Sequence, residues 1–382
     1  MVASPSQEDT ALPTVAHCAT PYPYAGAAWI YHQITYLKRY RPIVLAQESS
    51  HQDQFPLEIL YSAQDYPPVR RLANRLLRRL TGQYPFYAAI LRRQGARLIH
   101  AHFGHQGCRC LRAKRACKLP MVTTFYGYDA TRDVHSPHWR PAYLRLFEQG
   151  EAFLAEGGAM KGRLVEAGCP ADKVHIQHLG VDLTAVPFAE RQPANPVRFL
   201  ICAPFREKKG IPYALEAVGA ALKRRDFPCQ VVLIGDGPDR PQVLQAIDRA
   251  GLQGRVDMRG MQPYEKVLQA VGECHIFLQT SITARDGDGE GGAPFMLLDA
   301  QASGLPVVAT RHADIPEVVV DGESGLLADE RDIEGLADRI LHLVENPGLW
   351  AQMGRGGRRH VEENYNAQIQ GGKLEEIYDA LR

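Results

Sequence analysis

The sequence predicts an α/β protein with two doubly wound parallel sheets. Its 382 residues exceed what a single hydrophobic core usually supports, so two domains are expected. Short apolar strands alternate with helices along the chain, which is typical of parallel sheets covered by helices on both faces. The stretch 187–197 is rich in proline and polar residues, and we expect it to link the two domains.

Composition places the chain among ordinary soluble globular proteins. Hydrophobic residues make up 45% and charged residues 23%. The formal charge of +1 gives no reason to expect nucleic acid as a partner. No apolar run reaches the roughly 18 residues of a membrane span, and residues 1–13 lack the basic and apolar parts of a secretory signal. The eight cysteines are scattered without zinc spacing, so we expect reduced thiols in a cytoplasmic protein.

The first half of the chain alternates strands with helices. A first strand, 13–18, leads through a turn containing Gly26 into a helix over 27–39. The segments 97–107 and 121–132 each begin as a strand and end in a turn that contains glycine. Further strands are predicted at 41–46, 153–156 and 172–183.

The second half repeats this pattern. Strands are predicted at 197–203, 229–234, 255–263, 275–279 and 305–310, with helices over 211–225 and 295–303 and a helical tail. The glycine turn 235–237 could suggest a dinucleotide fold. The GxGxxG pattern is absent, however, because Asp239 and Arg240 follow Pro238. A hydride-transfer enzyme is therefore disfavoured.

The stretch 279–318 organises the second domain. It begins as a loop in which Asp286, Asp288 and Glu290 alternate with glycines, and Pro294 then stands where a helix begins. A glycine loop that opens into a helix directs free N–H groups at its ligand, and phosphate suits such a site best. Acidic side chains on both sides of a phosphate site could hold sugar hydroxyls. The loop therefore predicts a nucleotide-sugar site.

This stretch resembles the donor-binding signature of the retaining family 4 glycosyltransferases, particularly those of exopolysaccharide and colanic acid biosynthesis. That family has two glutamates separated by seven residues, in the form EGxPxxxxE. Here eight residues separate Glu290 from Asp299, because the loop has one more glycine, and the second acid is an aspartate. The resemblance implies the GT-B fold, in which two Rossmann-like domains face a cleft. It also implies a nucleotide diphosphate sugar, UDP- or GDP-linked, as the donor.

Two segments of the first domain resemble the same family. HAHFG (100–104) and TFYGYD (124–129) are similar to its HxHFG and TFHGxD segments, which border the interdomain cleft. Tyr126 stands where the family often has histidine. By resemblance, catalytic roles are implied for Glu290, His102 and Asp129, and donor contacts for Gly26 and Gly127.

The basic loop 204–210 is expected to contact the donor diphosphate. In the family, an arginine five residues before the lysine of a KG pair does so together with that lysine. Here Lys209 and Gly210 match, Pro204 stands at the arginine position, and Arg206 is the proposed substitute. The alternative is a solvated basic loop. The remaining donor-binding residues are predicted to be Gly235, Gly260, Met261, Gly291, Gly292, Ala293, Pro294 and Asp299, of which Asp299 would hold the ribose.

No essential metal or other cofactor is predicted. Asp286 and Asp288 imitate the DxD motif of metal-dependent glycosyltransferases and the start of a calcium loop. The twelfth position counted from Asp286 is Leu297, however, where a calcium loop has glutamate. The phosphate charge is expected to be met by Lys209, Arg206 and a helix N-terminus.

A basic amphipathic helix is predicted between residues 68 and 93. Leu72, Leu76 and Leu80 recur every four residues, and no acid occurs within 69–80. Two interpretations stay open: the leucines pack in the domain core, or this face meets an anionic membrane or a lipid-phosphate acceptor. The arginines around the leucines are Arg70, Arg71, Arg75, Arg78 and Arg79.

Three functions remain open. The first is a retaining glycosyltransferase of polysaccharide, lipid-linked glycan or glycolipid biosynthesis, which would stabilise the departing diphosphate. The second is a nucleotide-binding GT-B protein without turnover, and the third is a nucleotide-sugar epimerase. The predicted partners are the donor, a glycan or lipid-linked acceptor and, through 69–80, the inner membrane face. The predicted domains are 1–190 on the acceptor side, 191–365 on the donor side, and a helix over 366–382 that crosses back.

Overall fold

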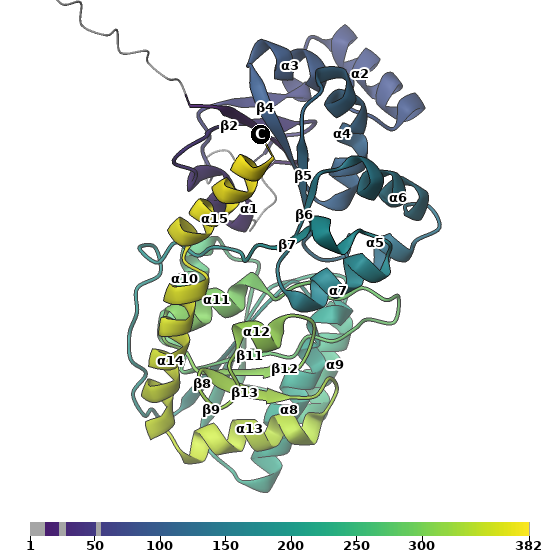
Figure 1. Ribbon diagram of the computed structural model, residues 1–382. Coiled ribbons are helices and arrows are strands. Elements are labelled where there is room, and N and C mark those ends of the chain that lie inside the picture. The colour runs from purple at the N-terminus through teal and green to yellow at the C-terminus, as the bar shows by residue number, and fades with distance from the viewer. Residues whose placement is uncertain (1–11, 23–27, 51–54, 382) are drawn as a thin grey trace, which may run out of the picture.

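A computed structural model describes residues 12–22, 28–50 and 55–381 of the chain. These residues form two α/β domains, drawn one above the other in Figure 1 with the N-terminal domain at the top. Each domain has its own parallel sheet, which confirms the predicted fold class. The two sheets lie within the predicted ranges 1–190 and 191–365, whose limits stay a prediction.

The N-terminal sheet has seven parallel strands in the order β3-β2-β1-β4-β5-β6-β7. Its central strands are buried on both faces, which is why they appear in the sequence as continuous apolar or β-branched runs. The strands are β1 (Thr14–Cys18), β2 (Arg41–Ala46), β3 (Leu60–Ser62), β4 (Ala96–His102), β5 (Met121–Thr124), β6 (Ala152–Ala155) and β7 (Val174–Ile176). The helices are α1 (Ala28–Thr35), α2 (Pro68–Thr81), α3 (Tyr87–Arg93), α4 (Gly104–Cys117), α5 (Arg132–His135), α6 (Arg140–Gln149) and α7 (Gly158–Glu166).

The C-terminal sheet has six parallel strands in the order β10-β9-β8-β11-β12-β13. A core of buried side chains joins its strands to α8, α9 and α13. The strands are β8 (Val197–Cys202), β9 (Cys229–Ile234), β10 (Val256–Gly260), β11 (Ile276–Gln279), β12 (Val307–Thr310) and β13 (Gly325–Ala328). The helices are α8 (Ile211–Arg224), α9 (Arg240–Ala250), α10 (Tyr264–Glu273), α11 (Phe295–Ala302), α12 (Ile315–Val318) and α13 (Ile333–Glu345).

The strand order of each sheet reverses at one point, and ligands of doubly wound sheets bind outside the strand ends there. In the N-terminal sheet this point lies between β1 and β4, and in the C-terminal sheet between β8 and β11. The loop 203–210 follows β8 and the loop 280–294 follows β11. The topology therefore brings together the two loops that the sequence analysis assigns to the donor.

The last two helices, α14 (Gly348–Asn364) and α15 (Ala367–Ala380), run along both domains in Figure 1. Leu374 and Tyr378 of α15 are buried in the same cluster as Val15 and Leu98 of the N-terminal sheet. The Tyr378 hydroxyl lies 2.5 Å from Nδ1 of His100. The chain thus crosses back onto its first domain at its C-terminal end.

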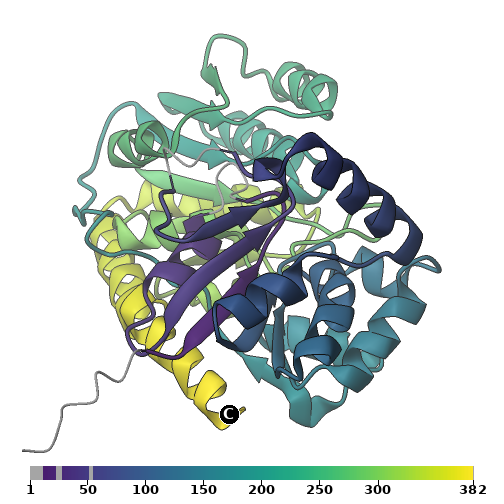
Figure 2. The ribbon, with the colours of Figure 1, turned by 90° about the horizontal axis from the view of Figure 1, so that it is seen from above.

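The predicted basic helix is α2, and its leucines do not enter the core. No residue of α2 is buried, and Leu72, Leu76 and Leu80 are 56%, 52% and 81% exposed. Figures 1 and 2 show α2 at the edge of the N-terminal domain. In the part of the chain that the structure describes, no helix has the length and apolar character needed to cross a membrane. The leucine stripe is therefore a surface feature.

Some sequence-based element limits are wrong. The predicted strand 172–183 is regular only over β7, and the predicted turn at the end of the segment 97–107 is the first turn of α4, which follows β4 directly. No sequence pattern predicts β3, α6 or β13. β3 and β13 have three and four residues, too few for a periodic pattern, and α6 has a proline in its first turn.

Candidate active site

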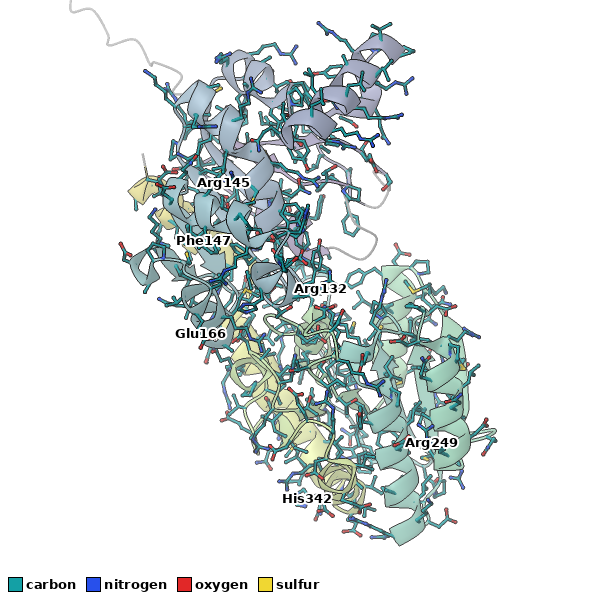
Figure 3. The ribbon with its side chains drawn as sticks, turned by 90° about the vertical axis from the view of Figure 1, so that its right-hand side faces the viewer. Arg132, Arg145, Phe147, Glu166, Arg249 and His342 are labelled. Atoms are coloured by element: carbon teal, nitrogen blue, oxygen red, sulfur yellow. The ribbon has the colours of Figure 1, made fainter. Side chains whose placement is uncertain are left out.

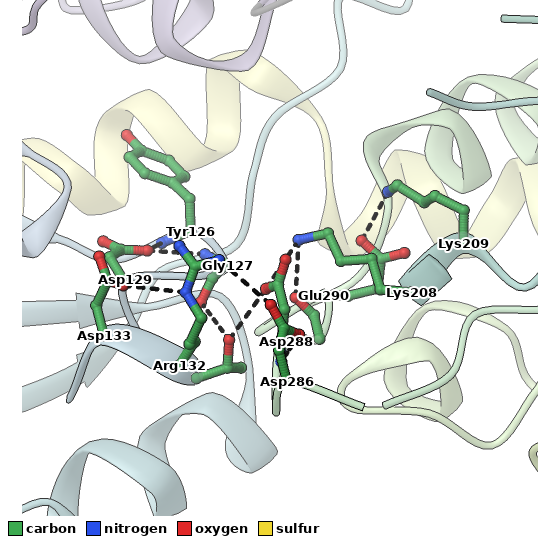
Figure 4. Close-up of polar contacts among 12 residues, drawn as sticks. Tyr126, Gly127, Asp129, Arg132, Asp133, Lys208, Lys209, Asp286, Asp288 and Glu290 are labelled. Atoms are coloured by element: carbon green, nitrogen blue, oxygen red, sulfur yellow. Dashed lines mark hydrogen bonds and ion pairs between the residues drawn. The ribbon is translucent and has the colours of Figure 1, made fainter. Parts of the chain in front are cut away.

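Glu290 is held in the loop between β11 and α11 by a lysine and a serine. Lys209 Nζ donates to Glu290 Oε2 over 2.7 Å, and Ser281 Oγ donates to Oε1 over 2.7 Å. Lys209 follows β8 and Ser281 follows β11, so the strand order brings these groups together. Figure 4 shows the Lys209–Glu290 pair. Both carboxylate oxygens are engaged, which fixes the orientation of the Glu290 side chain.

Glu290 is ionised although it is buried. Burial raises the pKa of a carboxyl group, but the charges of Lys209 and Lys208 and the hydrogen bonds from Lys209 and Ser281 outweigh it and lower the pKa of Glu290 below its ordinary value. The backbone amide of Glu290 donates to Nε2 of His312 over 3.1 Å. His312 Nδ1 lies 2.6 Å from Oε1 of Glu330, a carboxylate that fixes the ring tautomer.

Two glycines allow the loop to touch the N-terminal domain. Gly291 has a φ of +79°, and a Cβ atom there would lie 2.7 Å from Cα of Gly127. At Gly292 a Cβ atom would lie 2.0 Å from Oε2 of Glu156, which accepts a hydrogen bond from the Ala293 amide over 3.2 Å. Any side chain at either position would separate the domains or displace the loop. The structure thus brings the predicted residues Gly127, Gly291, Gly292 and Ala293 into one place.

Asp286 and Asp288 form ion pairs at the domain boundary. Asp286 Oδ2 lies 3.5 Å from Nη1 of Arg132, and Asp288 Oδ1 lies 3.2 Å from Nζ of Lys208. Thr131 Oγ1 also donates to Asp288 Oδ1 over 3.4 Å. In Figure 4 these partners approach the loop from both domains. Asp286 and Asp288 therefore link the loop to Arg132 of the N-terminal domain and to Lys208 of the basic loop.

Asp299 lies on α11 and is 1% exposed. Its Oδ1 accepts a hydrogen bond from the Tyr264 hydroxyl over 3.0 Å, whereas Oδ2 has no partner among the described residues. Burial raises the pKa of Asp299 to about 7, although the bond from Tyr264 works in the opposite direction. A buried carboxyl oxygen with free acceptor capacity suits a ligand hydroxyl. This agrees with the ribose role predicted for Asp299, which stays a prediction.

His102 and Asp129, predicted to be catalytic, are both fully buried. Asp129 Oδ1 accepts hydrogen bonds from the amides of Tyr126 and Gly127, and Oδ2 accepts one from the Gly104 amide over 2.8 Å. Asp129 thus positions the turn of Gly127 against the start of α4. His102 Nδ1 lies 2.5 Å from the hydroxyl of Tyr126, the residue before Gly127. His102 is therefore linked to the site through Tyr126. Direct catalytic roles for both residues stay predictions.

Three buried histidines form the one group of possible metal ligands found among the described residues. Ligand nitrogens of His17, His100 and His102 lie within 4.8 Å of one another. Burial lowers the pKa of all three rings, which are therefore neutral. His100 already contacts Tyr378 and Thr124 through its two nitrogens. The group thus serves as a hydrogen-bonded core that includes α15.

The other predicted donor residues lie at the ends of neighbouring strands. Gly235 follows β9, and its amide donates to the carbonyl of Gly260 at the end of β10 over 2.9 Å. Met261 follows Gly260 and is 64% exposed.

Arg206 is exposed and lies next to the 3-10 turn that contains Lys209. Pro294 is the N-cap of α11 rather than its first residue. Gly26 lies outside the described residues.

Several site residues escape the sequence analysis. Lys208 Nζ contacts Asp288 and donates to the Gly289 carbonyl over 3.0 Å, and the double lysine of the loop 204–210 was the available signal. Glu156 is buried against the glycine loop, and burial together with Asp314 raises its pKa well above the ordinary value. Asp314 and Glu317 accept hydrogen bonds from the amides at the start of α7. These acids lack a local motif, because only the tertiary structure brings them to the boundary.

Two Rossmann-like domains that meet beside a buried lysine–glutamate pair, where the strand order of the C-terminal sheet reverses, are the arrangement of a glycosyltransferase of the GT-B class. The family profile described as Glycosyltransferase Family 4 matches residues 30–185, and the profile described as Glycosyl transferases group 1 matches residues 196–346. The putative colanic acid biosynthesis glycosyltransferase WcaL of Escherichia coli K12 is 33% identical over 314 residues, covering 81% of this chain and 75% of WcaL. The chain belongs to glycosyltransferase family 4.

Other comparisons agree with this family. The amylovoran biosynthesis glycosyltransferase AmsK of Erwinia amylovora is 33% identical over 289 residues, covering 75% of this chain and 70% of AmsK. The crystal structure of Anabaena HepE with UDP has a TM-score of 0.74 at 18% identity, covering 97% of this chain and all of that chain. A glycosyltransferase from Rickettsia africae has a TM-score of 0.77 at 18% identity, covering 97% and 98%. These structures share the GT-B fold.

Proposed function

We propose that this glycosyltransferase moves a sugar from a nucleoside diphosphate to an acceptor hydroxyl and retains the anomeric configuration. The observation that carries the proposal is the buried, ionised Glu290 beside Lys209, where the strand order of the donor-side sheet reverses. HepE has been crystallised with UDP and with UDP-glucose, which supports a UDP-linked donor. A GDP-linked donor is the alternative.

The donor diphosphate is proposed to lie between the loop 203–210 and the start of α11. Lys209 and Lys208 supply positive charge there, and exposed Arg206 is a third cation of the same loop. The amides at the start of α11 would donate hydrogen bonds to the same diphosphate. Catalysis would come mainly from stabilising the charge of the departing diphosphate. Glu290 would then hold sugar hydroxyls, and Asp299 the ribose.

The reaction is proposed to need no divalent cation. The two acids that imitate a metal-binding motif, Asp286 and Asp288, pair with Arg132 and Lys208. Binding a cation would require breaking these pairs, whereas Lys209 is a cation that a diphosphate can draw from Glu290 without any metal.

The acceptor is proposed to be a glycan carried by a lipid. The relatives named for colanic acid and amylovoran biosynthesis support a role in polysaccharide assembly. Helix α2 supports attachment to an anionic membrane, because its leucines are exposed and its five arginines have no acidic neighbour within 69–80. Each basic residue near such a surface contributes only about 1 kcal/mol to the binding free energy. Five arginines alone therefore give an attachment that is reversible.

Incubation with UDP- and GDP-linked sugars, with and without excess chelator, tests the proposal. The expected result is slow release of the nucleoside diphosphate from one donor at a rate that the chelator leaves unchanged. Nucleotide binding without release from any donor would favour a binding protein, and altered donor sugars without release would favour an epimerase. A rate abolished by chelator and restored by magnesium would contradict the metal-free mechanism.

A further inference from the structure

A hollow of about 680 Å³ lies on the N-terminal domain outside the candidate active site. It runs between α4 and α6, and Thr81 at the end of α2 closes one side. Four of its lining residues are arginines, and no acidic residue lines the hollow. The residues that matter for its chemistry are Arg109, Arg112, Arg115, Arg145, Leu111 and Trp139. Arg145 is labelled in Figure 3.

These four arginines lack ion-pair partners among the described residues. Arginines gathered in one hollow without counter-charges repel one another, and an anion that binds between them removes this repulsion. One guanidinium group can donate two parallel hydrogen bonds to a phosphate. A phosphate or diphosphate therefore suits the hollow best.

One wall of the hollow is already rigid. The Arg109 guanidinium lies 5.6 Å from the ring centre of Trp139 and 5.9 Å from that of Tyr84. A row of aromatic rings continues towards the active site, because His105 lies 5.9 Å from Trp139 and 5.9 Å from Tyr128. Tyr128 is adjacent to Gly127 in the chain. A row of aromatic rings thus lies between the hollow and the turn of Gly127.

An apolar hollow of about 210 Å³ adjoins the basic one and shares Thr81, Gln83 and Arg112 with it. Leu77 from α2 and Pro85 line it, together with alanines of α3 and α4. A ligand with a charged head and a hydrocarbon chain could occupy both hollows at once. Leu77 belongs to the exposed face of α2, so the apolar hollow is continuous with the surface proposed to meet the membrane.

We propose that the two hollows bind an alkyl diphosphate ester, with the diphosphate between the arginines and the first carbons of the chain beside Leu77. This deepens the proposed function, because a lipid-linked acceptor carries such a group. It differs from general membrane attachment, which uses the outward arginines of α2. Membrane lipids and a lipid-linked acceptor both present phosphate esters. A soluble alkyl diphosphate therefore distinguishes binding in the hollows from attachment of α2 to a membrane.

Calorimetry with geranyl diphosphate, inorganic pyrophosphate and phosphatidylglycerol vesicles tests the proposal on the full chain. The variant Arg112→Gln/Arg115→Gln/Arg145→Gln changes the hollow, and Arg71→Gln/Arg75→Gln/Arg79→Gln is a control of equal charge on α2. We expect the first variant to bind geranyl diphosphate at least about tenfold more weakly, since charge-assisted hydrogen bonds are lost. The control should bind it normally and lose vesicle binding instead.

A Lys209→Gln variant separates this site from the donor site and should keep geranyl diphosphate binding. The proposal would be overturned if the wild type did not bind geranyl diphosphate, or if the hollow variant bound it as tightly as the wild type. It would also be overturned if both triple variants lost affinity for geranyl diphosphate equally. Equal affinity for pyrophosphate would overturn the role of the apolar hollow and with it the lipid ligand. These results do not depend on turnover, so release of no nucleoside diphosphate from any sugar donor would contradict the proposed function separately.

Discussion

At the scale of single residues, Glu290 is distinguished by three properties that the sequence does not display. It is buried, it is ionised, and both of its carboxylate oxygens accept hydrogen bonds. A buried charge of this kind is costly unless a partner compensates it. Here Lys209 does so, and a donor diphosphate that draws Lys209 away would leave Glu290 free to accept bonds from sugar hydroxyls.

Replacing Glu290→Gln should lower turnover by about a hundredfold, the usual cost of removing one group that stabilises a transition state. The amide keeps the shape of the side chain but loses the charge, so the fold should remain intact. The rate of nucleoside diphosphate release and the thermal unfolding midpoint measure the two effects. Glu323→Gln, at a distant surface ion pair with Arg359, is the control. A fully active Glu290→Gln protein would contradict the assignment.

Asp299 predicts a pH dependence of nucleotide binding. Its pKa is about 7, and a ribose hydroxyl that donates to Oδ2 favours the ionised form and lowers this pKa. Affinity should therefore rise by up to tenfold per pH unit below about pH 7 and level off above it. Calorimetry at pH 6 in buffers of different ionisation enthalpy should detect the released proton. Asp299→Asn should bind with a flat profile, and an unchanged slope in that variant would exclude the role of Asp299.

The raised pKa of Asp299 also predicts how stability changes with pH. Between about pH 4 and pH 7 the folded protein holds a proton on Asp299 that the unfolded chain releases, so this residue destabilises the fold progressively as pH rises through that range. Asp299→Asn removes this effect. Its unfolding midpoint should accordingly exceed that of the wild type at pH 8 and approach it near pH 4.

At the scale of elements, the loop 280–294 shows how far sequence reasoning reaches. Its glycines, the proline before α11 and the position of Glu290 all follow from local patterns, because turn chemistry and helix starts are local. The partners Glu156 and His312 could not be found in this way. They come from other elements, and the strand order of the two sheets determines which loops meet.

The close contact of Gly292 with Glu156 predicts a coupled pair of substitutions. Gly292→Ala places a methyl group against the Glu156 side chain and should cost about 1–3 kcal/mol in unfolding free energy. Combining it with Glu156→Gly removes the clash, so the double variant should recover much of that loss. Chemical denaturation of all four proteins measures the coupling. Simple additivity would show that the loop relaxes away from Glu156 instead.

Helix α2 predicts salt-sensitive membrane binding. The protein should co-sediment with vesicles that contain phosphatidylglycerol but not with neutral vesicles, and binding should weaken as salt rises, since screening acts over about 8 Å at physiological ionic strength. Changing Arg71, Arg75 and Arg78 to glutamate should abolish it. Arg140→Glu, at an exposed position of the same domain outside α2, provides the comparison. Absence of binding to either vesicle would instead favour a soluble acceptor.

At the scale of the whole molecule, the predicted two-domain α/β architecture is confirmed, because alternating apolar strands and helices leave few other solutions. The contacts at the interface between the domains could not be predicted in the same way. Its contacts join acids such as Asp314 to backbone amides at the start of α7, and amides carry no sequence signal. The exposure of the leucines on α2 also needed the structure, since a periodic apolar stripe fits a core and a surface equally well.

The central claim is retaining transfer from a nucleotide sugar, and proton NMR of the anomeric signals during donor hydrolysis tests it most directly. With an α-linked UDP- or GDP-sugar, the donor signal should decay while the free α-sugar appears before its β-form. Glu290→Gln should slow this decay by the same factor as diphosphate release. First appearance of the β-sugar, or a changed donor sugar with the diphosphate still attached, would contradict retaining transfer.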